Sequence, residues 1–257
     1  MFELSAEEWT AVALSLRVAA ASTAVALPFG IAIAWVLARK DFPGKALLNA
    51  VIYLPLVLPP VVTGYLLLLA FGRKGLFGEA LANIGIVFSF RWTGAALACG
   101  VMAFPLLVGA IRLSIEAVDR KFEDAAATLG ANRIWTFLTV TLPLTLPGII
   151  AGAVLAFARA LGEFGATITF VSNIPGETQT ISAAIYTLTQ VPGGDSKALH
   201  LVIIAILISL VALVASEWFG RRAGARVHGV SMLIVDRNAP TIGLHQAGDH
   251  ADDAGLA

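Results

Sequence analysis

The sequence predicts an all-α integral membrane protein with five transmembrane helices, and it leaves a sixth span open. Of the 257 residues, 58% are hydrophobic and only 13% are charged, whereas soluble domains are about one quarter charged. Several stretches hold the roughly 20 successive apolar residues that a helix needs to cross a bilayer. The first of them is longer than the apolar part of a secretory signal and is followed by Arg39 and Lys40 instead of a cleavage site. We therefore expect it to be retained as a span.

The five expected spans differ in what interrupts them; they cover residues 10–38, 46–72, 92–111, 147–172 and 198–219. Three prolines in the second should kink or break its helix, and the freed carbonyls then need protein or water as partners. Residues 178–191 have apolar side chains at helical spacing but are too short to cross, which predicts an interfacial or re-entrant helix. Residues 226–257 show no sustained period, and we expect a flexible tail that includes His245 and His250.

The distribution of Lys and Arg predicts the orientation of the chain. If the N-terminus lies outside, residues 39–45, 112–133 and the C-terminal tail are cytoplasmic and hold eleven of these cations. The outer segments, residues 73–91 and 172–199, then hold four. Cytoplasmic connections carry the excess of Lys and Arg, so we expect an outer N-terminus and a cytoplasmic C-terminus.

Composition and missing motifs argue against several other classes of protein. The formal net charge is zero, so we expect no nucleic acid partner. With Cys99 as the single cysteine, neither an intrachain disulfide nor a cysteine metal cluster is possible, and we expect no metal and no cofactor in this chain. No Gly-x-x-x-x-Gly-Lys-Ser/Thr loop and no Gly-x-Ser-x-Gly elbow occurs. The sequence therefore argues against an enzyme, while an ATP-independent channel or secondary carrier stays open as an alternative.

The interval between the third and fourth spans predicts two short helices at the membrane face. The first has a charged side and an apolar stripe of Ile115, Val118, Phe122, Ala125 and Leu129. Gly130 suits the left-handed position after this helix. Asn132 is placed to cap a second helix over residues 133–141, which Leu142-Pro143 should end. Periodicity alone is equally typical of an ordinary interfacial helix pair.

The same interval resembles the EAA loop of ABC importer permeases. The family pattern is Glu-Ala-Ala, three residues, Gly, nine residues, Ile, one residue, Leu-Pro. Its counterparts here are Asp124, Ala125, Ala126, Gly130, Val140, Leu142 and Pro143, with Glu123 one position early as the alternative acid. The resemblance implies the type I ABC importer permease fold, in which the loop at residues 115–143 carries a coupling helix that docks on a separate ATPase.

The fourth span holds Arg159 and Glu163 near its middle, at a spacing of four residues that places them on one helix face. An ionisable group at that depth needs a partner, so we expect the two to pair. The pair either locks helices together or belongs to a translocation pathway or gate. In the second interpretation Gly162, Gly165 and Thr167 lie beside it, and a weak, paired charge suits a conduit that must release its substrate.

The run from Phe157 to Thr167 and the segment Asn173 to Tyr186 closely resemble the permease subunits of molybdate importers. Sulfate permeases are less similar in the Ile-Pro-Gly-x-Thr-Gln-Thr part of that segment, which spans residues 174–180 here. The resemblance covers about residues 8–225. It implies a permease homodimer in lipid, in the bacterial plasma (inner) membrane, with two ATPase subunits and a periplasmic or extracellular molybdate-binding protein. Sulfate and tungstate are the alternative substrates, because in this family the external protein selects the oxyanion.

Overall fold

A computed structural model describes the backbone of residues 5–237 and the side chains up to residue 218, apart from residue 216. The described part is helical and contains no strand. Its elements are α1 (Ala6–Arg39), α2 (Lys45–Val57), α3 (Pro60–Phe71), α4 (Gly78–Asn83), α5 (Trp92–Ala117), α6 (Arg120–Thr128), α7 (Arg133–Thr136), a π-helical turn (Phe137–Thr141), α8 (Leu142–Leu161), α9 (Gly165–Val171), α10 (Ile181–Thr189) and α11 (Asp195–Arg237).

Four described helical stretches are long and apolar enough to cross a membrane, and a bent pair makes a fifth candidate. The four are Ala6–Arg39, Trp92–Ala117, Arg133–Leu161 and Asp195–Ala215. The bent pair is α2 and α3, between which the chain bends by 116°. Pro59 caps α3 and Pro60 opens it, so the amide donors needed to continue α2 are missing. The expected interruption of the second span is therefore confirmed, and the helical fold with five candidate spans agrees with the prediction.

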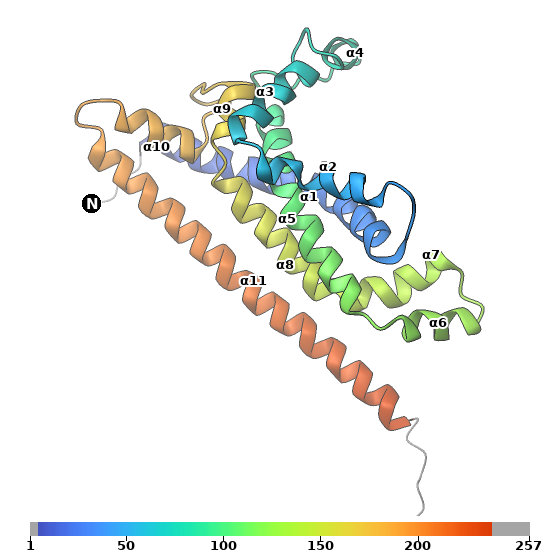
Figure 1. Ribbon diagram of the computed structural model, residues 1–257. Coiled ribbons are helices and arrows are strands. Elements are labelled where there is room, and N and C mark those ends of the chain that lie inside the picture. The colour runs from blue at the N-terminus through green and yellow to red at the C-terminus, as the bar shows by residue number, and fades with distance from the viewer. Residues whose placement is uncertain (1–4, 238–257) are drawn as a thin grey trace, which may run out of the picture.

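The centre of the protein is formed by α1, α5 and α8, which lie against one another in Figure 1. Leu37, Leu107 and Ile111 are fully buried between them. At Gly152 a Cβ atom would lie 3.3 Å from the carbonyl oxygen of Leu107, so the glycine lets α8 approach α5 closely. α11 runs along the outside of this core, and α6 and α7 project at one end (Figure 1).

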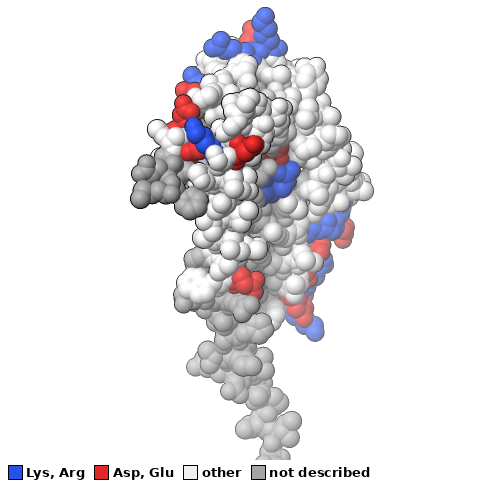
Figure 2. All heavy atoms as spheres, turned by 90° about the vertical axis from the view of Figure 1, so that its left-hand side faces the viewer, with Lys and Arg blue, Asp and Glu red and all other residues white. Residues whose placement is uncertain are grey.

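The outer surface is mostly apolar, as a lipid-facing surface must be. Figure 2 shows one face on which most residues carry no charge and the charged ones gather in patches. Many of the large exposed apolar side chains lie on α2, α3 and α11, among them Leu47, Val57, Val61, Val211 and Leu213. The helix expected within residues 178–191 is confirmed as α10, whose Ile181 is buried against α1.

Three boundaries differ from the sequence-based expectation. The apolar stripe that starts at Ile115 is not one helix, because α5 continues to Ala117 and α6 begins after Asp119. Leu142-Pro143 does not end the second short helix. The π-helical turn before Leu142 leads directly into α8. This wider turn accommodates Pro143, which an ordinary α-helical turn would not.

The fourth span and the tail also differ. α8 ends at Leu161 and α9 starts at Gly165, so the span expected over residues 147–172 is broken near its charged pair. α11 continues to Arg237, although we expected a flexible tail from residue 226; the mostly apolar stretch 230–235 lies within this extension. The rest of the expected tail, with His245 and His250, lies outside the described residues.

Candidate functional site

The first candidate site is the elbow formed by α6, α7 and the π-helical turn, residues 119–141. Each bend in it has a local cause. Asp119 caps α6 by accepting a hydrogen bond from the amide of Lys121 at 2.9 Å. Gly130 has φ +86°, and its amide donates to the carbonyl of Ala127 at 3.0 Å. Asn132 accepts from the amide of Trp135 at 2.8 Å and caps α7. The expected left-handed turn at Gly130 and the expected helix cap at Asn132 are confirmed.

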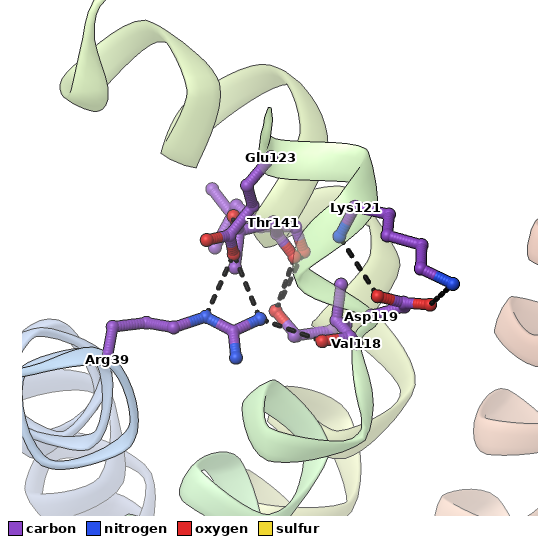
Figure 3. Close-up of polar contacts among 8 residues, drawn as sticks. Arg39, Val118, Asp119, Lys121, Glu123 and Thr141 are labelled. Carbon is purple, nitrogen blue, oxygen red and sulfur yellow. Dashed lines mark hydrogen bonds and ion pairs between the residues drawn. The ribbon is translucent and has the colours of Figure 1, made fainter. Parts of the chain in front are cut away.

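Glu123 holds the elbow to the transmembrane core, as Figure 3 shows. Its Oε1 accepts from the Nε of Arg39 at 2.9 Å and from the hydroxyl of Thr141 at 2.9 Å. Arg39 also donates to the carbonyl of Val118 at 3.0 Å. The side chains of Arg39 and Glu123 are only 8% and 21% exposed. One ion pair therefore joins the end of α1, the end of α5, α6 and the turn before α8; below we call these contacts the Arg39–Glu123 joint.

The joint distinguishes the two acids that the sequence left as alternatives. The Glu123 carboxylate is bound to Arg39 and Thr141 within the protein, whereas Asp124 is exposed. Within residues 5–237, no hydrogen bond or ion pair of the Asp124 side chain is present. Ala125 is also exposed and Ala126 is half-buried. Asp124 and the two alanines are thus the part of the EAA pattern that a partner surface can reach.

Leu142 and Pro143, at the end of the pattern, lie apart from this surface. Leu142 packs against the buried cluster around Ile111 and Ile115, so it anchors the start of α8. Pro143 is exposed on α8. The exposed apolar residues of the elbow lie elsewhere: Leu129, Ile134 and Trp135 are 89%, 73% and 60% exposed.

The second candidate site is the break between α8 and α9. Arg159 and Glu163 form the expected ion pair, with 2.7 Å between Nη1 and Oε2. Our prediction that they share one helix face was wrong, because α8 ends at Leu161. The physical reason is that Glu163 also accepts from the amide of Ala166 at 2.9 Å, and so stabilises the first turn of α9. Its side chain is 1% exposed, while that of Arg159 is 32% exposed.

The neighbouring small residues have different surroundings. At Gly165 a Cβ atom would lie 2.8 Å from the Cβ of Pro60, so this glycine allows α9 to pack against the start of α3. Gly162 is exposed, and a Cβ there would meet only the Arg159 carbonyl at 4.0 Å. Thr167 is buried and donates to the carbonyl of Phe164 at 2.9 Å. Thr167 therefore has no free hydrogen to offer a ligand in this conformation.

The two candidate sites lie at opposite ends of α8. A helix of 20 residues is about 30 Å long, so the joint and the charged break do not touch. α8 connects them directly, because the π-helical turn that carries Thr141 leads into it and Arg159 lies in its last turn. A single packed helix therefore connects the elbow to the break.

The joint is the feature that sequence reasoning missed. From the sequence, Arg39 counts only toward the retention of the first span and the orientation of the chain, and Thr141 only as a residue of the short second helix. A signal was present in the sequence: a cation, Arg39, ends one span, and a second acid, Glu123, lies two positions before the EAA alanines. Residues separated by 84 positions cannot be matched by local periodicity.

The chain resembles transport proteins over most of its length. The family described as "Binding-protein-dependent transport system inner membrane component" matches residues 26–225. The molybdenum transport system permease protein ModB of Escherichia coli (strain K12) is 62% identical over 85% of this chain and 96% of the relative. ModB of Haemophilus influenzae is 56% identical over 84% and 94%. The sulfate transport system permease protein CysT of Salmonella typhimurium is 38% identical over 78% and 72%.

Solved structures agree on the fold. A bacterial ABC transporter involved in the import of alginate superposes with a TM-score of 0.68, at 20% identity, over 85% of this chain and 80% of the other. The relatives above are named as permease proteins of transport systems and not as enzymes. With the fold of an ABC importer permease and these relatives, the chain belongs to the family of binding-protein-dependent transport system inner membrane components.

Proposed function

We propose that this chain is the membrane-spanning permease subunit of an ATP-driven molybdate importer and that it forms the translocation pathway. The observation that carries the proposal is the 62% identity with a molybdenum permease, which extends over 96% of that relative. The sulfate permease is more distant at 38%. Sulfate and tungstate are the alternative substrates, because they are oxyanions of the same charge and shape.

The motor in this proposal is a separate ATPase, present in two copies. The chain has no phosphate-binding Gly-Lys-Ser/Thr loop of its own. The surface offered to the ATPase is the outer side of the elbow, with Asp124, Ala125, Ala126 and the turn at Gly130. Two alanines allow close approach, and a free carboxylate provides an anchor for a cation. The Arg39–Glu123 joint then passes movement of the elbow to α1 and α8.

The pathway is proposed to lie beside the break between α8 and α9, in a homodimer of this chain. Gly165 brings the break against α3, and α2 and α3 expose apolar side chains that suit packing by a second copy or by lipid. The half-exposed guanidinium of Arg159 attracts a dianion. Its pairing with Glu163 keeps that attraction weak enough for release. An external binding protein delivers the substrate.

The proposed location is the bacterial inner membrane, with the N-terminus outside. In that orientation α6 and α7 lie in the cytoplasm together with the end of α11, and α4 and α10 lie outside. The excess of Lys and Arg in residues 39–45 and 112–133 supports this choice. No cofactor or metal is needed by the permease in this scheme.

Reconstitution tests the proposal. The chain is inserted into liposomes with its ATPase and its binding protein, and ATP hydrolysis and uptake are measured with molybdate, tungstate and sulfate. We expect molybdate to stimulate both, and only when the binding protein is present. Uptake that persists without ATPase would favour a channel or secondary carrier instead. Stimulation by sulfate but not by molybdate would contradict the assigned substrate.

A further inference from the structure

A basic cavity lies behind the elbow, between the end of α1, α6 and α7. Its volume is about 340 Å³, within the size range of small-ligand sites. The cations that line it are Arg39, Lys40, Arg120 and Arg133, and the acids are Glu123 and Asp124. The cavity shares Asp124 with the outer side of the elbow proposed to meet the ATPase, whereas Ala125, Ala126 and Gly130 of that side do not line it.

Within the described part of the chain, three of the four cations have no acid partner. Glu123 is neutralised by Arg39 in the joint. Among the described residues, Lys40, Arg120 and Arg133 form no ion pair. Asp124 is the remaining acid in the lining of the cavity. Three unpaired cations and one acid give the lining a surplus of positive charge. A cavity with this lining attracts an anion.

Neighbouring groups do not remove this surplus. The hydrogen bond from Lys45 lowers the pKa of Asp41 below its ordinary value, and Arg120 adds to the effect. Asp41 is thus near Arg120, yet it is already paired with Lys45 at 2.8 Å. The ammonium of Lys40 lies 5.5 Å from the ring centre of Trp35, a contact that leaves its hydrogen-bond donors free.

The cavity lies where two membrane spans end. Lys40 directly follows α1, and Arg133 is the first residue of the stretch Arg133–Leu161 that is long enough to cross. Trp35 and Phe137 form an edge-to-face pair in the lining, with 5.8 Å between ring centres. Aromatic and basic side chains at this level are typical of the boundary between acyl chains and headgroups. The ends of these spans therefore place the cavity at the level of the lipid headgroups.

We propose that this cavity binds the headgroup phosphate of an anionic phospholipid, held by Lys40, Arg120 and Arg133. Basic pockets between transmembrane helices on the cytoplasmic side take such headgroups. A bound lipid would lie against Trp35 and the joint, and so would brace the elbow at the membrane surface. The assignment is independent of which oxyanion is transported; the proposed orientation enters only in the choice of leaflet.

Lipid retention by the purified full-length chain tests this site. Native mass spectrometry is used to titrate the chain with phosphatidylglycerol and with phosphatidylcholine of the same acyl chains. The test variant replaces Lys40, Arg120 and Arg133 with Gln. The control replaces Arg73 and Lys74, two exposed cations in the connection between α3 and α4 that do not line the cavity. We expect preference for phosphatidylglycerol in the wild type and in the control.

Each cation near a charged membrane surface contributes about fivefold to binding. The triple variant should therefore bind phosphatidylglycerol roughly 100-fold more weakly, while its binding of phosphatidylcholine stays unchanged. The single variant Arg133→Gln, with a loss of about fivefold, provides the same comparison if the triple variant does not insert. Unchanged affinity in a folded variant overturns the proposal.

Two further arms identify the occupant. Glycerol 3-phosphate, which has the phosphate but no acyl chains, should not displace the lipid at equal concentration. Displacement would mean that the cavity takes a soluble phosphate and would overturn the lipid assignment. The ATPase subunit is added last; loss of phosphatidylglycerol on its addition would show that a protein partner fills the cavity, which also overturns the proposal.

Discussion

Replacing Glu123 with Gln should release the elbow from the membrane core. The change removes the charge that holds Arg39 while keeping the side-chain shape. Both partners are less than one quarter exposed, so solvent screening is weak. Removing one member of a buried ion pair costs about 3–5 kcal/mol. The Gln oxygen still accepts one hydrogen bond and Val118 still accepts another, which reduces the expected cost to about 2–3 kcal/mol.

Hydrogen exchange of the chain in nanodiscs measures this cost locally. Because 1.4 kcal/mol corresponds to a factor of ten, the amides of α6 should exchange about 30 to 150 times faster in Glu123→Gln. The matched control is Glu116→Gln, which breaks the pair of Arg112 and Glu116 at 2.7 Å. That pair is four residues apart on one helix and 29% and 41% exposed, so its loss should change exchange by about twofold.

A double variant separates charge pairing from other effects. Arg39→Met combined with Glu123→Gln removes both charges and leaves no unpaired guanidinium. We expect it to recover part of the protection lost in Glu123→Gln, because the cost of an unpaired buried charge disappears. Equal exchange in Glu123→Gln and Glu116→Gln would refute the conclusion that the joint holds the elbow.

Three other changes test the remaining parts of the structure. Gly130→Val should uncouple ATP hydrolysis from uptake, because a valine in the left-handed conformation is strained by at least about 1–2 kcal/mol. Gly85→Val, with similar strain at φ +82°, is the control and should leave coupling intact. Equal loss of uptake in the two variants would contradict the coupling role of the elbow. Arg159→Leu and Glu163→Leu should each reduce uptake more than the double change if the pair mainly neutralises itself, whereas complete loss in all three indicates direct contact with substrate. Gly165→Ala should destabilise the contact of α9 with α3 by about 1–3 kcal/mol, as measured by thermal unfolding in detergent, and an unchanged midpoint would show that the contact is loose.

The positions of most helical spans could be predicted from the sequence, because the membrane restricts the backbone of an apolar stretch. A backbone in lipid must satisfy its own hydrogen bonds, so a long apolar stretch is forced into a helix. That is why α1, α5 and the apolar part of α11 lie where composition predicted them. Prolines 59 and 60 remove donors at fixed positions, so the break between α2 and α3 was also predictable.

Boundaries between helices were harder to predict where two local rules compete. Pro143 normally ends a helix, yet a π-helical turn before it lets the chain continue into α8. Glu163 suits a pair with Arg159 four residues back, yet it also stabilises the first turn of α9. Which choice wins depends on neighbouring helices, since Gly165 must fit against Pro60.

The sequence by itself determined the class of protein, the spans other than the fourth, the turn at Gly130 and the cap at Asn132, because each depends on residues close together in the chain. Only the tertiary structure decided that Glu123 faces inward while Asp124 stays exposed. That choice depends on Arg39, which is 84 positions away. Tertiary packing decides which distant residue lies beside a buried charge. The local periodicity of the sequence does not indicate such long-range pairs.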